Sequence, residues 1–158
     1  MKGKPEVLSA LAEMLREEMA ALNQYMLHAE MCDNWGYKRL GGQTKKQAIG
    51  EMKHTEKLIE RILFLEGMPQ MDSMAPLKIG KSVKEQLQND LELERGAVKE
   101  YNKAIETCRK AGDNATADFL KEILKDEEDH VDFLETQLGL IEQIGLQNYL
   151  SQQLEEEE

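Results

Sequence analysis

The chain has 158 residues, of which 41% are hydrophobic and only three are proline, and this suits one folded domain with a sizeable core. Its formal net charge of −11 argues against a nucleic-acid partner, because phosphate contacts need clustered Lys and Arg. No apolar run of signal-peptide or membrane-spanning length opens the sequence, so we expect no membrane association and a cytoplasmic location.

Two helices open the predicted fold. Apolar residues recur every three or four positions between residues 6 and 35, as an amphipathic helix requires. Pro5 suits the first turn of this helix, and Gly36 offers a stop. A second periodic segment follows, and Thr44 with Gln47 predicts a capping box at its start. Gly41-Gly42 leaves this boundary open by several residues. The short connection predicts that the two helices pair antiparallel.

Residues 67 to 82 break the helical pattern. They hold two prolines and two glycines, which indicates a connection rather than a helix. Extended, this segment can span up to about 50 Å, and the first predicted helix is about 45 Å long. The connection can therefore run the full length of a bundle. Such a crossover between the second and third helices distinguishes one class of four-helix bundle from up-down bundles with short loops.

Two further long helices follow the crossover. Ser82 and Glu85 predict a capping box at the start of the third helix. Asp113 or Asn114 is the predicted cap of the fourth. Gly139 and Gly145 are predicted to interrupt the helical pattern, so that a short helix stands apart at the end of the chain.

The predicted fold class is all-α, in a single domain that spans residues 1–158. The four-helix bundle occupies about residues 5–138, and the short fifth helix about residues 145–153. Cys32 and Cys108 lie far apart in helical context, which is typical of small buried hydrophobes and favours neither a disulfide nor a thiolate metal site.

A Glu-x-x-His pattern occurs twice, and residues three apart on a helix share a face. In each half of the chain, a further glutamate precedes the pattern by the same 33 residues. The set is Glu18, Glu51 and His54 in the first half, and Glu94, Glu127 and His130 in the second, at a constant offset of 76 residues. Two Glu-x-x-His helices and two single-glutamate helices make the ligand set of a di-iron carboxylate bundle.

The chemistry of this set favours a pair of divalent cations. Four carboxylates balance the charge of two such ions bound by neutral imidazoles, whereas without metal the buried carboxylates would repel one another and be forced to protonate. Mixed oxygen and nitrogen ligands suit iron or manganese, and zinc or cobalt could bind equally well.

The alternative interpretation is a solvated acidic surface, since a single Glu-x-x-His on an acidic helix is usually a surface pair. Asp126, Glu128 and Asp129 beside the second copy are interpreted in that way, as an outer face. Two copies with equally spaced partner glutamates and a long crossover favour the metal centre.

Each single-glutamate helix also carries a tyrosine seven residues after its glutamate, on the same face two turns away. These are Tyr25 and Tyr101, and a hydroxyl that orients a ligand carboxylate is a hypothesis for both, with Tyr25 the better candidate. His28 lies roughly 80° from the direction of Glu18, so we expect a structural or surface role for it.

The chain resembles bacterioferritins essentially from end to end. The segments that carry the resemblance are Asn23-Gln24-Tyr25, Asn34-Trp35-Gly36, Glu51-Met52-Lys53-His54, residues 61–67, Asp126-Glu127-Glu128, His130, Leu134-Glu135-Thr136 and residues 145–150. The resemblance implies a ferritin-like bundle with a ferroxidase centre in which Glu51 and Glu127 bridge two irons. Glu18 with His54, and Glu94 with His130, would complete the two shells.

The resemblance also implies function and partners. Members oxidise Fe(II) with O2 or H2O2 and store the ferric product in a 24-subunit shell built from two-fold dimers. A ferredoxin is the expected electron donor for iron release, which a b-type haem at the dimer interface would aid.

Met52 is the residue at which the haem would bind. It follows Glu51 directly, so the helical rotation of about 100° turns it away from the metal face. From the sequence alone, a methionine on a helix is usually core or gap-filler. The resemblance implies that Met52 is an axial haem ligand, paired with its symmetry mate. Lys46 and Gly50 stand where some members of the resembled family carry polar or acidic residues that could hold additional iron, which puts an iron-entry route through these positions in doubt.

Two other functions stay open on the residues. One is a di-iron peroxidase of the rubrerythrin or manganese-catalase kind, although the chain holds no Cys-x-x-Cys pair. The other is a non-catalytic shell subunit, against which the presence of all six ligands argues.

Overall fold

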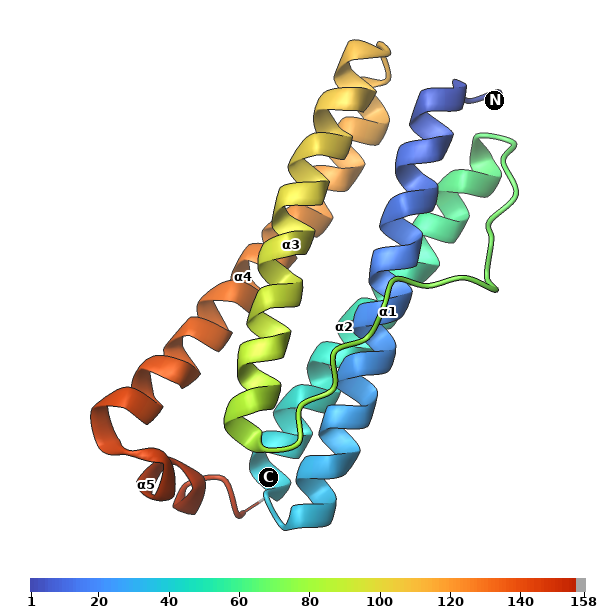
Figure 1. Cartoon of the computed structure of the whole chain (residues 1–158). Coiled ribbons are helices and arrows are strands. Elements are labelled where there is room, and N and C mark those ends of the chain that lie inside the picture. The colour runs from blue at the N-terminus through green and yellow to red at the C-terminus, as the bar shows by residue number, and fades with distance from the viewer. Residues whose placement is uncertain (156–158) are drawn as a thin grey trace.

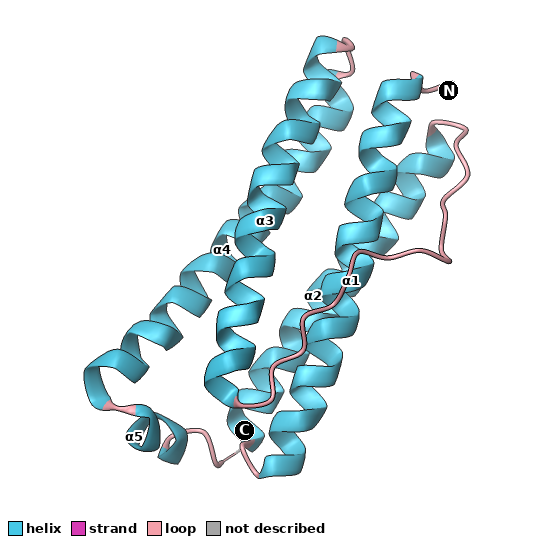
Figure 2. Ribbon diagram, in the orientation of Figure 1, coloured by secondary structure: helices cyan, strands magenta, loops and turns pink. Residues whose placement is uncertain are grey.

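The computed structural model describes residues 1–155, and these contain helices and no strand (Figure 2). The helices are α1 (Pro5–Trp35), α2 (Lys38–Phe64), α3 (Val83–Lys110), α4 (Asn114–Ile144) and α5 (Leu146–Ser151). The predicted all-α fold is confirmed. No helix within residues 1–155 is long and apolar enough to cross a membrane.

The four long helices form two antiparallel hairpins, α1 with α2 and α3 with α4, which pack side by side (Figure 1). The segment between α2 and α3 runs along α1 from one end of the bundle to the other, so α2 and α3 point the same way. The predicted long crossover is therefore present. Helix α5 lies across the end of the bundle at which α3 begins.

Most predicted helix ends agree with the structure. Pro5 occupies the first turn of α1, and Gly36 ends it with φ +94°, a left-handed conformation that glycine adopts without strain. The Ser82 hydroxyl accepts a hydrogen bond from the Glu85 N–H at 3.3 Å. The Asp113 carboxylate accepts one from the Thr116 N–H at 3.0 Å. These caps satisfy N–H groups that a helix start leaves unpaired.

The predicted start of α2 was wrong. The helix begins at Lys38, so Thr44 lies inside it, buried, rather than at a cap. The reason lies in the packing of α2 on α1. A Cβ atom at Gly41 would lie 2.1 Å from the Asp33 side-chain oxygen Oδ1. Gly41 thus permits a close approach of the two helices, and this tertiary contact outweighs the helix-breaking tendency of glycine.

The predicted interruption at Gly139 was also wrong. Helix α4 continues through Gly139 to Ile144 and ends at Gly145, where φ is +84°. A glycine inside a helix costs only about 1 kcal/mol relative to alanine. Leu138 and Ile141 on either side of it pack into the apolar cluster under α5, and that burial keeps the helix continuous.

The apolar core is divided into parts. The larger cluster includes Val7, Leu11, Met14, Leu15, Leu58, Ile62, Tyr101, Ile105, Leu120 and Ile123. A second cluster gathers Cys32, Leu40, Val83, Leu87, Leu91, Leu134, Ile141 and Tyr149, and so fixes α5 to the bundle. Both cysteines are buried and free, as predicted. Burial raises the pKa of Cys32 to about 12 and that of Cys108 to about 11, so both thiols stay protonated.

A buried polar group docks the crossover against α1 and α3. The N–H groups of Lys78 and Gly80 donate to Gln24 Oε1 and His28 Nε2, each at 3.0 Å. Asp90 lies between these two side chains, with its Oδ1 at 2.8 Å from Gln24 Nε2 and 2.9 Å from His28 Nδ1. His28 is therefore structural, one of the two roles expected for it. Asp90 escaped the sequence analysis, because only the fold brings it to His28.

Candidate metal centre

All six predicted ligand residues lie together in the middle of the bundle. Helix α1 supplies Glu18, α2 supplies Glu51 and His54, α3 supplies Glu94, and α4 supplies Glu127 and His130. The four glutamates are 2% exposed or less. Each hairpin thus contributes three side chains to one buried cluster, as the constant spacing in the two halves predicts.

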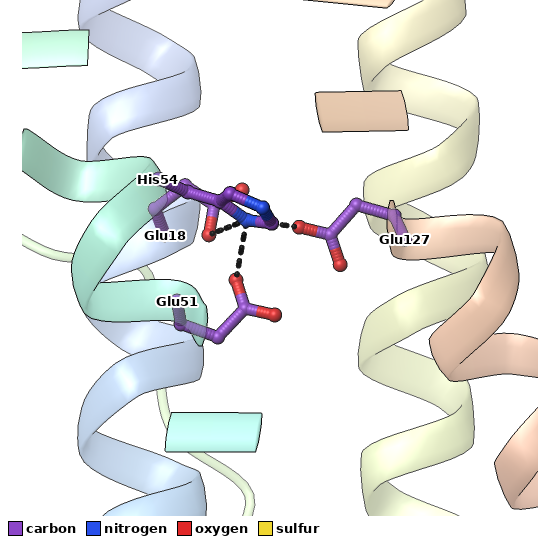
Figure 3. A group of neighbouring side chains, drawn as sticks. All are labelled: Glu18, Glu51, His54 and Glu127. Atoms are coloured by element: carbon purple, nitrogen blue, oxygen red, sulfur yellow. Dashed lines mark ion pairs between the residues drawn. The ribbon is translucent and has the colours of Figure 1, made fainter. Parts of the chain in front are cut away.

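The first half of the centre gathers around His54 (Figure 3). Its Nδ1 atom lies 3.5 Å from Glu18 Oε2 and 3.5 Å from Glu51 Oε2. The third neighbour, Glu127 Oε1, approaches from α4 at 3.2 Å. One nitrogen and three carboxylate oxygens therefore converge on one small volume, a donor set suited to a divalent cation.

The second half gathers around His130 in the same way. Its Nδ1 atom lies 3.0 Å from Glu51 Oε1, 3.4 Å from Glu94 Oε1 and 3.2 Å from Glu127 Oε2. Glu51 and Glu127 therefore serve both halves, each with one oxygen toward His54 and the other toward His130. Two shared carboxylates between two terminal sets are the arrangement that a pair of metal ions requires.

The buried polar atoms of the cluster fit metal ions. Five carboxylate oxygens and one ring nitrogen have no hydrogen-bond partner within the protein: Glu18 Oε2, Glu51 Oε1 and Oε2, Glu94 Oε2, Glu127 Oε1 and His54 Nδ1. Leaving such atoms buried and unpaired is costly. Cations placed between these atoms would bind all six. The atoms that lack hydrogen-bond partners are therefore the same atoms that would serve as metal ligands.

In the absence of metal, protons take the place of cations. Burial raises the pKa of Glu51 to about 8 and that of Glu127 well above its usual range. Burial opposes protonation of His130, but the close carboxylates of Glu127, Glu51 and Glu94 favour the charged ring more strongly and raise its pKa to about 12. The pKa of His54 is raised in the same manner by Glu127, Glu18 and Glu51. A metal ion must therefore displace protons to bind.

The tyrosines contact the glutamates in a crossed pattern. The Tyr25 hydroxyl donates a hydrogen bond to Glu94, and the Tyr101 hydroxyl donates one to Glu18. Each tyrosine therefore holds the terminal carboxylate of the other hairpin, not the one on its own helix. Both side chains are fully buried. The spacing indicated two candidate tyrosines, but only the packing of α1 against α3 determines which glutamate each one reaches.

The chain is similar in sequence to proteins of known family. A family model described as Ferritin-like domain matches residues 8–144. The chain is 45% identical to the bacterioferritin of Brucella melitensis, over 94% of this chain and 92% of that protein. It is 45% identical to the bacterial ferritin of Synechocystis sp., over 98% and 99%, and 41% identical to the bacterioferritin of Mycolicibacterium paratuberculosis, over 96% of each chain.

The chain belongs to the bacterioferritin family.

One residue of this bacterioferritin-family centre escaped the sequence analysis. Asp126 was assigned to a solvated outer face, and it is exposed, but its Oδ2 atom lies 2.8 Å from His54 Nε2. It approaches the imidazole from the side opposite to the ligand carboxylates. Glu128 and Asp129 are exposed, as predicted. Nothing in the local pattern separates Asp126 from these two acids, because the contact crosses from α4 to α2.

Met52 lies outside the metal centre. Its side chain is 41% exposed on α2, whereas Glu51 and His54 are buried. The predicted rotation away from the metal face is therefore confirmed. Gly50 borders open space, since a Cβ atom there would meet nothing within 4 Å.

We expect that Tyr101→Phe weakens metal binding about tenfold, because Glu18 loses the hydroxyl that orients it. The buried carboxylate also loses a hydrogen bond, which should lower the free energy of unfolding by about 2 kcal/mol. Calorimetric titration with Co(II) and urea unfolding measure the two effects. Tyr149→Phe is the matched control, since the Tyr149 hydroxyl donates to Gln137, away from the centre. Equal Co(II) affinity in wild type and Tyr101→Phe would contradict the orienting role.

Proposed function

We propose that this chain is an iron-storage protein whose buried centre oxidises Fe(II) to Fe(III) with O2 or H2O2. The proposal is carried by Glu51 and Glu127, each of which turns one oxygen toward either half of the centre. The names of its relatives, bacterioferritin and bacterial ferritin, support iron as the metal. The catalytic and metal-binding residues would be Glu18, Glu51, His54, Glu94, Glu127 and His130.

The six residues would have two different roles in metal binding. Glu51 and Glu127 would hold two Fe(II) ions side by side, while Glu18 with His54, and Glu94 with His130, would complete the two positions. Four carboxylates neutralise the charge of two such ions, so binding leaves no excess charge in the buried core. The tyrosine hydroxyls keep the terminal carboxylates in place, and the surrounding apolar core limits the access of water.

The electron balance is simple, because each Fe(II) ion is a substrate that loses one electron. One pair of ions reduces one H2O2 with two protons to two waters, or one O2 with two protons to one H2O2. The carboxylates bind the more highly charged Fe(III) products more strongly by electrostatics, which favours the oxidised side of the reaction.

We further propose that the chain, as one domain over residues 1–158, acts in the cytoplasm as a homo-oligomer, a 24-subunit shell assembled from two-fold dimers. Met26, Ile49 and Met52 are large apolar side chains at the surface of α1 and α2, and their exposure supports burial against another copy. Met52 would bind a b-type haem there with its symmetry mate. A ferredoxin would be the electron donor for iron release.

Oxygen uptake after addition of Fe(II) to the sized native particle tests the proposal. A large closed shell that accelerates uptake over buffer and retains many more than two irons per subunit is the expected result. A dimer that retains only two metals would indicate a peroxidase. A shell without acceleration would indicate a non-catalytic subunit.

Metal binding should strengthen as pH rises from about 6 to about 8, by up to tenfold per pH unit for each proton displaced. The sign follows from the raised pKa values of His130 and Glu51, because protonated forms predominate at low pH and cannot bind a cation. Calorimetry in buffers of different ionisation enthalpy counts the protons released. Binding that is independent of pH over this range would contradict the proton displacement.

A further inference from the structure

The two imidazoles of the centre differ at the ring nitrogen that points away from the carboxylates. His54 Nε2 lies 2.8 Å from Asp126 Oδ2, while its Nδ1 faces Glu18, Glu51 and Glu127. Within residues 1–155, no contact of this kind is found for His130 Nε2. The His130 side chain is also 17% exposed, against 4% for His54. The His54 ring is thus contacted by carboxylates at both nitrogen atoms, and the His130 ring at Nδ1 alone among the described contacts.

The internal repeat locates the cause of this difference. The offset of 76 residues that relates Glu51 to Glu127 also relates Gly50 to Asp126. The position that should face His130 therefore carries no side chain. Because a Cβ atom at Gly50 would meet nothing within 4 Å, the surrounding packing does not forbid a carboxylate there. The asymmetry lies in the residue itself.

We propose that Asp126 is a positioning residue for His54, and that glycine at the matching position 50 makes the two metal positions unequal, with the Glu18–His54 position the tighter. This inference rests on the proposed di-metal function. A carboxylate that accepts a hydrogen bond from Nε2–H fixes the tautomer in which Nδ1 carries the lone pair toward the metal, and it makes that nitrogen a better donor. Asp126 therefore prepares His54 for binding.

Within the described residues, no carboxylate accepts a hydrogen bond from His130 Nε2. Only its Nδ1 side is held by carboxylates, so the ring can take more than one orientation before a metal binds, and binding must also order the side chain. Ordering the side chain weakens binding, because the ring loses conformational entropy. The greater exposure of His130 adds to the difference, since water competes for its nitrogen atoms. Both effects weaken the Glu94–His130 position and leave the Glu18–His54 position unchanged.

Titration of the full-length assembled protein with Co(II), followed by visible absorbance and by calorimetry, tests the inference. The wild type should bind two ions per subunit in two resolved steps. Asp126→Ala should weaken the tighter step by about 10- to 100-fold and leave the weaker step in place. Asp129→Ala is the matched control, an exposed acid on the same helix, and it should change neither step by more than about twofold.

Gly50→Asp provides the reverse experiment. It should restore a carboxylate beside His130, strengthen the weaker step and bring the two steps together. Gly50→Asn controls for the added volume and the helix propensity, and it should give a smaller gain because the amide carries no charge. A structural disturbance would weaken binding in both Gly50 variants, so a selective gain in the aspartate variant separates positioning from packing.

The outcomes distinguish this inference from the function on which it rests. A wild type that binds fewer than two Co(II) ions per subunit overturns both. If two ions bind but Asp126→Ala behaves like Asp129→Ala, or weakens both steps equally, only the positioning role fails. Two wild-type steps of equal affinity overturn the inequality while leaving the di-metal centre intact.

Discussion

Glu127→Ala should slow Fe(II) oxidation by more than about 100-fold, beyond the loss expected for a residue that only supports a ligand. The reason is that Glu127 directs one oxygen toward each half of the centre. Its removal would therefore take a ligand from both metal positions and leave Glu51 as the only carboxylate that both proposed positions share. The initial rate of ferric absorbance after mixing with Fe(II) measures the effect, and metal analysis should show fewer than two ions retained.

Two variants give this experiment its controls. Glu128→Ala removes the next carboxylate along α4, which is exposed, and should keep the wild-type rate. Glu94→Ala removes a terminal ligand from one half only, so it should slow oxidation less than Glu127→Ala does. Circular dichroism and particle size verify that each variant folds and assembles. A Glu127→Ala protein with the wild-type rate would remove the bridging role, and with it the main support for the proposed function.

Met52→Leu should abolish haem absorbance in the purified protein and leave the Fe(II) oxidation rate within about twofold of wild type. Leucine matches methionine in volume and apolar character, so packing changes little. It lacks the thioether sulfur that would bind the haem iron. The exposed side chain of Met52 points away from the buried ligands on the same helix, so the two cofactor positions should respond separately.

Met68→Leu is the control for this variant, since Met68 is an exposed methionine in the crossover. It should keep both haem absorbance and oxidation. Haem that survives Met52→Leu would contradict the ligand role of this residue. A loss of oxidation together with haem would show instead that the two faces of α2 are coupled.

The sequence predicted the ligand candidates well because their chemistry depends on spacing. A Glu-x-x-His pattern puts two donors on one face of any helix, and the equal spacing of Glu18 and Glu94 from their partners needs no tertiary knowledge. The crossover could also be predicted from the sequence, since two prolines and two glycines within 16 residues disfavour a helix there. All six residues accordingly lie together in the folded chain.

Contacts between helices were beyond the sequence analysis. Asp126 was placed among solvated acids, because its neighbours share its local pattern and only the fold brings it to His54. The tyrosine hydroxyls reach the opposite hairpin for the same reason. At Gly41, a residue that usually ends helices instead permits α1 and α2 to approach closely. Each of these contacts joins two different helices, and the spacing of residues along one helix does not determine the distance to another.

The shared carboxylates and crossed tyrosines make each hairpin incomplete without the other. Because each hairpin brings one set of the same three ligands, two identical hairpins related by a two-fold axis would build the same centre. Joining them through the crossover frees the two copies to diverge. The difference between Gly50 and Asp126 is such a divergence, one that a symmetric pair of identical hairpins could not express. A single chain can thus give its two metal positions different affinities.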